Sequence, residues 1–303
     1  MLSLRERVKE ALKKVLAIIR LEGWNGARRI WKHILHQPLL SRREKALKMV
    51  NHNGLGLEIG PSHNPIAPKK LGFNVHILDH SNAEGLCAKY RGHGVNLENI
   101  EKVDFVWGGE PLCELIGSEK CYDWIIASHV IEHTPDLVSF LVDCERLLKD
   151  DGVLSLIIPD KRYCFDYIQA QTSTGELLDA YDQKRKHPTP GKVFDHFAGA
   201  TKLNGKIAWD SSTRGTIEFV HTFSEATEYW RRASARQEPR EYIDVHNWRF
   251  TPASFRAILF DLQALGLIHF DVKMEFDTAG CEFFVTLQKP SIVANAKEAI
   301  SSG

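Results

Sequence analysis

The chain has 303 residues, of which 43% are hydrophobic and 26% charged, and its formal net charge is zero. This composition is typical of a globular protein, and the zero net charge excludes a global field that would attract nucleic acid. The charge is unevenly spread, because residues 1–50 hold thirteen Lys/Arg and only four Asp/Glu.

The cysteines and the apolar segments indicate the cellular compartment of the protein. The six cysteines have no regular spacing, which favours free thiols in a reducing environment over a disulfide framework. No apolar run approaches eighteen residues, and the N-terminus lacks the apolar core and cleavage site of a secretory signal. We therefore expect a cytoplasmic protein, and the sequence does not indicate its oligomeric state.

Residues 1–50 are predicted to form a basic helical segment. Apolar residues recur at helical spacing between Leu4 and Ile19, with basic residues on the opposite face. Two interpretations stay open: a helical cap on the main domain, or a peripheral contact with the anionic inner face of a membrane.

From residue 51 to 290 the pattern predicts one α/β domain, followed by a tail over 291–303. Apolar runs predict five strands that alternate with helices, at Leu55–Gly60, Asn74–Asp79, Val103–Trp107, Tyr122–Ser128 and Val153–Ile158. Unalternating apolar strands of this kind form a parallel sheet that is covered on both faces. Thr251-Pro252 begins a helix that runs to about Leu265, and two further strands, Ile268–Phe276 and Cys281–Gln288, predict a terminal antiparallel hairpin. Residues 160–250 break the rhythm and are predicted to be a partly helical insertion that binds the acceptor substrate.

The loop Glu58-Ile59-Gly60-Pro61-Ser62 follows the first strand and is the first candidate site. Gly60 permits a ligand to approach the backbone, and Asp79 ends the second strand about twenty residues later, where a carboxylate grips a ribose. The loop lacks G-x-G-x-x-G, so a nicotinamide dinucleotide is not expected.

With these motifs, residues 54–290 resemble the class I S-adenosylmethionine-dependent methyltransferases, which have a Rossmann-like seven-stranded sheet. The run ASHVIEHTPDL…LLKDDGVLSLIIPDKRYCFDY resembles a bacterial branch associated with surface-polysaccharide and glycan biosynthesis. The resemblance implies S-adenosylmethionine as cofactor. It implies that Glu58, Gly60, Pro61 and Ser62 lie along the methionine part of the cofactor. It also implies that Asp79 binds the ribose, and that Ser128 and His129 line the methionine end.

The chain departs from this family at two points. Ser62 stands where a second glycine is common, and Trp107-Gly108-Gly109 stands near the acid that usually meets the adenine amino group. Asp104 or Glu110 is a candidate replacement for that acid, and Trp107 is a candidate to stack on the base.

The segment His129-Val-Ile-Glu132-His133 matches the H-x-x-E-H pattern of inverted zinc peptidases. A zinc site needs a third protein ligand and a long helix, whereas Pro135 follows at once. We therefore expect no metal here, and expect His133 to lie near the acceptor.

Candidate catalytic and acceptor-binding residues follow the fifth strand. Deprotonation of a hydroxyl acceptor needs a base, and histidine suits this role near neutral pH. The candidate bases are His196, His246 and Asp160, with Asp195 and Asp244 as carboxylates that orient the rings. Candidates for acceptor binding, besides His133, are Lys161, Arg162, Tyr163, His221 and Trp248. The alternative for each of these residues is a purely structural role, as a packed side chain or as part of a charged turn.

The sequence thus predicts a methyltransferase that acts on an oxygen of a sugar or glycan. The alternatives are an amine or small-metabolite acceptor, and a cofactor-binding scaffold protein without catalysis. Nucleic acid is not an expected partner, because the chain outside residues 1–50 lacks a basic stripe.

Overall fold

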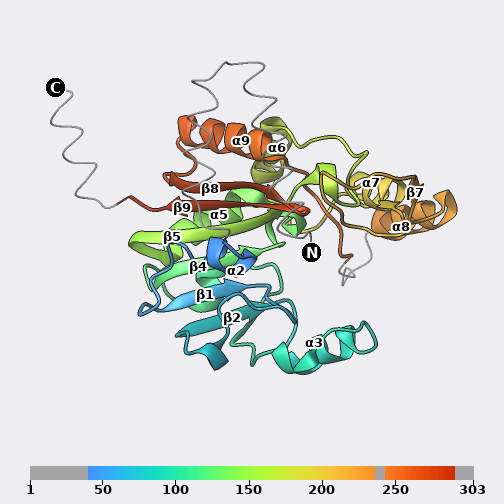
Figure 1. Cartoon of the computed structure of the whole chain (residues 1–303). Helices are drawn as coiled ribbons and strands as arrows, with labels where there is room; N and C mark the ends of the chain where they lie inside the picture. The colour runs from blue at the N-terminus through green and yellow to red at the C-terminus, as the bar shows by residue number, and fades with distance from the viewer. Residues whose placement is uncertain (1–39, 236–242, 291–303) are drawn as a thin grey trace, which may run out of the picture. The chain divides into compact units, whose positions relative to one another are not determined.

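A computed structural model of the chain describes residues 40–235 and 243–290 (Figure 1). Most of the basic helical segment and all of the tail over 291–303 lie outside the described residues. The chain divides into two units, Met1–Lys45 and Ala46–Gly303, and the site belongs to the second. Among the described helices, none has the length and apolar content to cross a membrane.

A seven-stranded sheet organises the second unit. Its strands stand in the order β3-β2-β1-β4-β5-β9-β8. Their bounds are β1 Gly56–Ile59, β2 Val75–Asp79, β3 Phe105–Val106, β4 Tyr122–Ser128, β5 Leu148–Pro159, β8 Asp271–Ala279 and β9 Glu282–Gln288. The first five strands are parallel, and β9 runs antiparallel between β5 and β8. The prediction of a mostly parallel Rossmann-like sheet with a terminal hairpin is confirmed.

The central strands are apolar on both faces because both faces are buried. In β4, Ile125 and Ala127 belong to one core cluster, and Trp124 and Ile126 belong to another. Helices α5 (Leu137–Leu147) and α9 (Pro252–Ala264) supply much of the first cluster. The third strand is shorter than predicted, because β3 is an edge strand that pairs only with β2.

Six further α-helices lie in the described residues. Their bounds are α2 Arg42–Ala46, α3 Ala83–Tyr90, α4 Leu112–Ile116, α6 Thr174–Asp182, α7 Pro190–Gly199 and α8 Phe223–Ala235. Short 3₁₀ turns occupy η1 Lys69–Leu71, η2 Leu97–Asn99, η3 Ile131–His133 and η4 Lys161–Tyr163. The predicted start of α9 is confirmed, because the Thr251 side chain accepts a hydrogen bond from Ser254 N and Pro252 occupies the first turn.

The predicted insertion leaves and rejoins the sheet at neighbouring points. Asp160 pairs with Phe250, and Lys161 N donates to Phe250 O at 2.9 Å. Between them lie α6, α7, α8 and a two-stranded sheet of β6 (Thr201–Leu203) and β7 (Ile217–Phe219). Figure 1 shows α7, α8 and β7 gathered beyond one end of the main sheet. The insertion is therefore partly helical, as predicted, and stands at the edge where the parallel strands end.

Candidate active site

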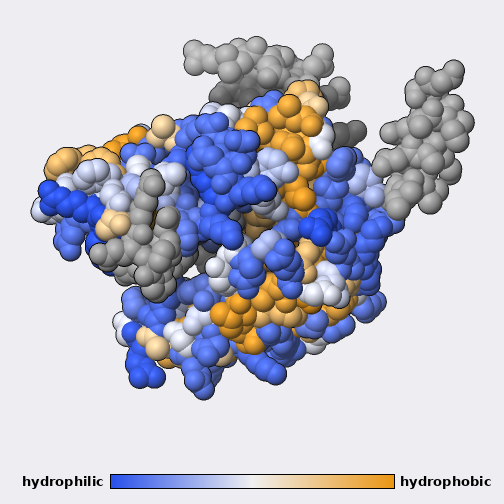
Figure 2. Space-filling view, turned by 180° about the vertical axis from the view of Figure 1, so that it is seen from behind, coloured by the Kyte–Doolittle hydropathy of each residue, from blue (hydrophilic) through white to orange (hydrophobic). Residues whose placement is uncertain are grey.

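A large cleft opens at the carboxyl ends of the parallel strands. Its volume is about 1660 Å³, and its walls come from the loops after β1, β2, β3 and β4 and from the insertion. The strand order reverses between β1 and β4, and an open α/β sheet binds its ligand at this switch point. Figure 2 shows the molecule hollowed between the part that holds α3 and the part that holds α7 and α8. Since single-ligand sites are usually about 300–1,000 Å³, the cleft has room for two ligands.

The loop after β1 is shaped by two residues that the sequence singled out. Gly60 has a φ of +65°, and a Cβ at this position would lie 2.8 Å from Val130 Cγ2. Ser62, also in the left-handed region at φ +47°, lines the cleft with Gly60. The close approach of this loop to the turn after β4 thus leaves no space for a side chain at position 60.

Glu58 differs from its expected role. Its carboxylate is buried, does not line the cleft, and accepts hydrogen bonds from Ile66 N at 2.5 Å and Ala67 N at 2.9 Å. The neighbouring Pro61 is also buried and outside the lining. Glu58 therefore holds the loop in shape rather than facing the cleft.

Replacing Glu58 with alanine tests this role. Ile66 N and Ala67 N would lose their acceptor in a buried place, at a cost of about 1–3 kcal/mol for each unsatisfied group. We expect the urea midpoint of unfolding to fall clearly. The exposed Glu119, paired with Arg146, is the control, and its alanine variant should change stability by less than about 1 kcal/mol. An unchanged midpoint for Glu58→Ala would show that the buried carboxylate is not needed.

Asp79 ends β2 on the wall of the cleft, as predicted. Its carboxylate accepts from Ser62 N at 2.9 Å and from His80 N at 2.8 Å, and lies 2.7 Å from His80 Nδ1. The loop after β3 lies beside it, with Trp107 in the lining and its Nε1 donating to Glu110 O at 2.8 Å. The structure does not bring Asp104 to this cleft, because it precedes β3 and pairs with Lys69 at 2.6 Å.

The turn after β4 carries an imidazole that lines the cleft. His129 lines the cleft and has a φ of +54°, a conformation that is strained for a non-glycine residue and is typical of functional sites. Its Nε2 lies 2.9 Å from Glu282 Oε2, at the start of β9, so the terminal hairpin supplies a carboxylate to this imidazole. Ser128, the preceding residue, is not part of the cleft lining.

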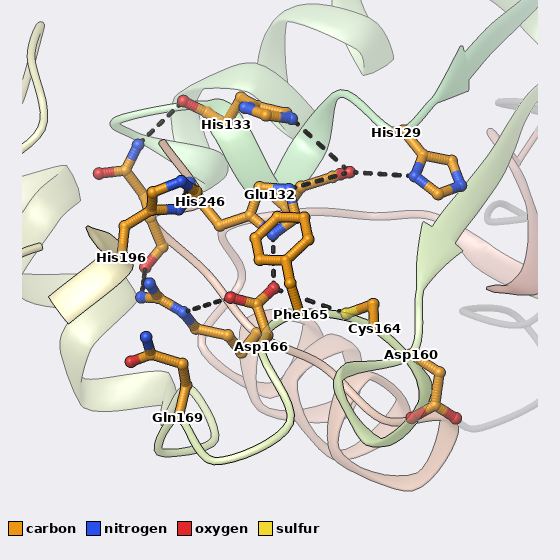
Figure 3. Close-up of polar contacts among 12 residues, drawn as sticks. His129, Glu132, His133, Asp160, Cys164, Phe165, Asp166, Gln169, His196 and His246 are labelled. Atoms are coloured by element: carbon orange, nitrogen blue, oxygen red, sulfur yellow. Dashed lines mark hydrogen bonds and ion pairs between the residues drawn. The ribbon is translucent and has the colours of Figure 1, made fainter. Parts of the chain in front are cut away.

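Three imidazoles surround one buried carboxylate, and we call this group the Glu132 cluster (Figure 3). Glu132 Oε1 lies 3.6 Å from His129 Nδ1, 3.9 Å from His133 Nε2 and 4.0 Å from His246 Nε2. Glu132 is fully buried and His246 nearly so, whereas His133 is 29% exposed and lines the cleft. The cluster thus forms part of the cleft wall and continues into the interior behind it.

Backbone hydrogen bonds clamp the two parts of this cluster together. The N–H groups of Asn247 and Trp248 both donate to Glu132 O, at 2.7 and 3.2 Å. Asn247 Nδ2 donates to His133 O, and Trp248 Nε1 donates to Thr134 O at 2.6 Å. Trp248 is therefore a buried anchor outside the cleft lining, and its prediction as an acceptor-binding residue is wrong.

A carboxylate holds the far nitrogen of two imidazoles in the cluster. His246 Nδ1 lies 2.5 Å from Asp166 Oδ2, and His133 Nδ1 lies 2.8 Å from Asp244 Oδ1. The sequence paired Asp244 with His246, which is wrong. Burial alone would raise the pKa of Asp166, but His246 and Arg249 outweigh it and lower this pKa to about 2. Burial alone would lower the pKa of His133, but Asp244 and Glu132 raise it above its ordinary value.

The other predicted bases do not reach the cleft. His196 Nδ1 accepts from His246 N at 3.0 Å, and burial together with the neighbouring His246 lowers its pKa to about 3. Asp160 is fully buried, ion-paired with Arg162 at 2.6 Å and hydrogen-bonded to Thr278 Oγ1. Their acceptor atoms are already engaged, so neither is placed as a base.

The remaining acceptor candidates also lie outside the lining. Lys161 Nζ donates to Tyr167 O, and Arg162 lies over the Tyr163 ring. His221 packs against Phe197, with ring centroids 5.0 Å apart. The cleft instead takes from the insertion a basic segment between α6 and α7 that the sequence motifs did not single out, Lys184-Arg185-Lys186-His187. Its run of charges was the signal that could have found it.

One comparison with known proteins points to an activity. A family model described as a methyltransferase domain matches residues 57–156. No curated protein matches the chain in sequence.

Solved structures give only distant likenesses. A Rhodobacter sphaeroides protein, provisionally described as a zinc-dependent alcohol dehydrogenase, is 13% identical with a TM-score of 0.47, over 84% of this chain and 92% of that one. A methyltransferase from Aquifex aeolicus, described as dependent on S-adenosylmethionine, is 13% identical with a TM-score of 0.40, over 85% and 96%. One from Mesorhizobium loti is 10% identical with a TM-score of 0.41, over 82% and 98%. These scores are too low to carry an argument.

The site fits the cofactor that the activity requires. The tight Gly60 loop, the Asp79 carboxylate and Trp107 lie around one end of a cleft that is large enough for a cofactor and a second substrate. With a methyltransferase domain over residues 57–156 on this sheet, the chain is an S-adenosylmethionine-dependent methyltransferase.

Proposed function

We propose that this methyltransferase acts on a hydroxyl oxygen of a sugar or glycan intermediate, with His129 as the base. The observation that carries the proposal is the His129 imidazole on the cleft wall, held through Nε2 by the Glu282 carboxylate. A carboxylate that orients a histidine in this way favours proton abstraction by the opposite nitrogen. This supports a hydroxyl acceptor over a free amine, which needs little help from a base.

The chain's own residues then have separate tasks. When bound, S-adenosylmethionine supplies a methyl group on a positively charged sulfur, which leaves with the electron pair of the broken bond. The acceptor oxygen forms the new bond to carbon, and its proton passes to His129 Nδ1. Glu282 stabilises the resulting imidazolium, and the cleft walls align the two substrates.

The basic segment Lys184–His187 supports an acceptor that carries a negative charge. Lys184 and Lys186 are exposed, and the segment lines the cleft between α6 and α7. Sugars that are activated for glycan assembly carry phosphate groups, and lysines at a cleft mouth attract such anions. The basic segment therefore fits an acceptor that is a phosphorylated sugar or a phosphorylated glycan carrier.

Replacing Lys184 and Lys186 with alanine together should raise the KM for such an acceptor about three- to tenfold, since each exposed ion pair contributes roughly 0.2–1 kcal/mol. The rate at saturating acceptor should stay the same, and the effect should shrink in high salt. A double variant at Lys202 and Lys273, which pair with acids away from the cleft, is the control. An equal KM for both double variants would rule out this role.

The direct test of the proposed function is the release of S-adenosylhomocysteine with matched acceptors. Purified protein would be given pairs of sugar phosphates that differ only in a hydroxyl, an amine or a blocking O-methyl group. We expect product with the hydroxyl compound and none with its O-methyl counterpart. Turnover that requires the amine would overturn the proposal.

A further inference from the structure

The Glu132 carboxylate lacks the hydrogen bonds that a buried charge requires. Its side chain is fully buried, and neither oxygen accepts a hydrogen bond from any residue in the parts of the chain that the structure describes. The nearest imidazole nitrogens, at 3.6–4.0 Å, are too far away to donate one. Burial of a carboxylate without compensation is strongly unfavourable.

Two of the imidazoles around it have their other ring nitrogen beside a second carboxylate. His246 turns its Nδ1 to Asp166 and His133 turns its Nδ1 to Asp244, and the carboxylate oxygens lie within 2.8 Å. A neutral ring that holds its proton on this Nδ1 turns the lone pair of its other nitrogen toward Glu132. The centre of the cluster then collects acceptors only, which is an arrangement for a positive charge.

The geometry points to a divalent transition-metal site formed by Glu132, His133 and His246. One ligand atom from each of the three lies within 4.8 Å of the other two. In a tetrahedral zinc site with bonds of about 2.0–2.1 Å, ligand atoms stand about 3.3–3.4 Å apart, so side-chain movements of roughly half an ångström would close the site. Two imidazoles with one carboxylate form a recurring catalytic set for zinc and related cations.

The outer contacts of the site support this assignment. Asp166 and Asp244 bind the far nitrogens of the two ligand imidazoles, as carboxylates do behind metal-bound histidines. The clamp from Asn247 to Glu132 O and His133 O fixes both ligand segments before any cation binds. The site is thus pre-formed.

The proposed site answers the sequence argument against a metal. The H-x-x-E-H pattern lacked a third ligand, and His246 supplies one from more than a hundred residues further along the chain. The pattern does not act as it does in a peptidase, because η3 is a single 3₁₀ turn and the ligands are the adjacent Glu132 and His133.

The open side of this site faces the cleft. His133 lines the cleft, whereas Glu132 and His246 lie behind it. A cation here would bind an acceptor oxygen beside His129 Nδ1 and make its hydroxyl more acidic. This last role rests on the proposed function, while the cation site itself does not.

The test uses the full-length, untagged protein after removal of metals with a chelator. Zinc binding is measured by calorimetry and by metal content after dialysis. We expect the wild type to bind one zinc per chain. Loss of a residue behind a metal ligand typically lowers metal affinity ten- to hundredfold, and we expect Glu132→Gln and His246→Gln, which remove ligands, to lower zinc affinity by more than that. His269→Ala, at a 67% exposed histidine, and Glu119→Gln should bind as the wild type does.

Thermal unfolding supplies a readout that does not depend on activity. Zinc should raise the Tm of the wild type and of both control variants, but not that of Glu132→Gln. Absence of zinc binding by the wild type, or equal binding by Glu132→Gln, would overturn the site and would mean that protons balance the cluster.

The cation site and the proposed function can fail separately. Zinc binding without methylation of any hydroxyl acceptor would leave the site standing and overturn the proposed function. If metal-free protein that does not bind zinc methylates a hydroxyl acceptor at an unchanged rate, the proposed function stands and the cation site is overturned.

Discussion

His129→Ala is expected to lower kcat by about 10²–10⁴-fold, the usual contribution of a positioned general base. The imidazole is 37% exposed, lines the cleft and is oriented by Glu282, so its removal takes away the proton acceptor without emptying the core. The measurement is the steady-state release of S-adenosylhomocysteine at saturating acceptor. Glu282→Gln, which keeps the shape but loses the charge, should cause a smaller loss and shift the pH profile of kcat.

The His129→Ala variant also distinguishes two roles of His129: the base proposed here, and the contact with the methionine end of the cofactor that the family resemblance implied. If His129 acts on the acceptor proton, the affinity for S-adenosylhomocysteine should stay close to that of the wild type. His269→Ala should be fully active. A loss of cofactor affinity with kcat unchanged would instead support a contact with the methionine end, and the assignment of the base would be withdrawn.

Asp79→Ala is expected to weaken the binding of S-adenosylhomocysteine about 10- to 150-fold, since hydrogen bonds to a charged group contribute about 1.5–3 kcal/mol. Asp79 stands on the cleft wall at the end of β2, where a carboxylate meets a ribose. Calorimetric titration with S-adenosylhomocysteine measures the change directly.

Asp104→Ala is the matched control for this prediction. Both carboxylates flank the short strand pairing of β2 with β3, but Asp104 lies outside the cleft lining and pairs with Lys69. We expect its variant to bind the cofactor product as the wild type does. Because Asp79 also holds Ser62 N and His80 N, thermal unfolding should confirm that its variant is folded. Equal affinities in both variants would exclude the predicted ribose contact.

The sequence predicted several strand and helix bounds correctly, because short-range interactions determine where these elements begin and end. The bounds of β4 and the start of α9 agree with prediction, since an apolar strand buried on both faces and a capped helix begin and end on short-range signals. The bounds of β3 do not, because an edge strand depends on its single neighbour for its length.

Among the site residues, the sequence located those that follow directly from a strand end. Gly60, Ser62, Asp79, Trp107 and His129 all line the cleft, because each stands at or just beyond the carboxyl end of a parallel strand. Glu58, inside β1, was misplaced by the same reasoning, since its carboxylate satisfies backbone N–H groups of the following loop. A strand position shows which edge a residue approaches but not what its side chain binds.

The pairing of the histidines was decided by tertiary structure alone. Sequence proximity joined Asp244 to His246, whereas the fold joins Asp166 to His246 and Asp244 to His133, and places Glu132 beside the three imidazoles of its cluster. The contacts of His246 with Asp166 and Glu132, and of His133 with Asp244, span 80 to more than 110 residues, and no periodic pattern encodes them. The sequence by itself determined the sheet, the loop after β1 and the types of residue available. Only the packing of the insertion against the turn after β4 decided which of them face each other, because that contact depends on hydrogen bonds between segments that lie far apart in the sequence.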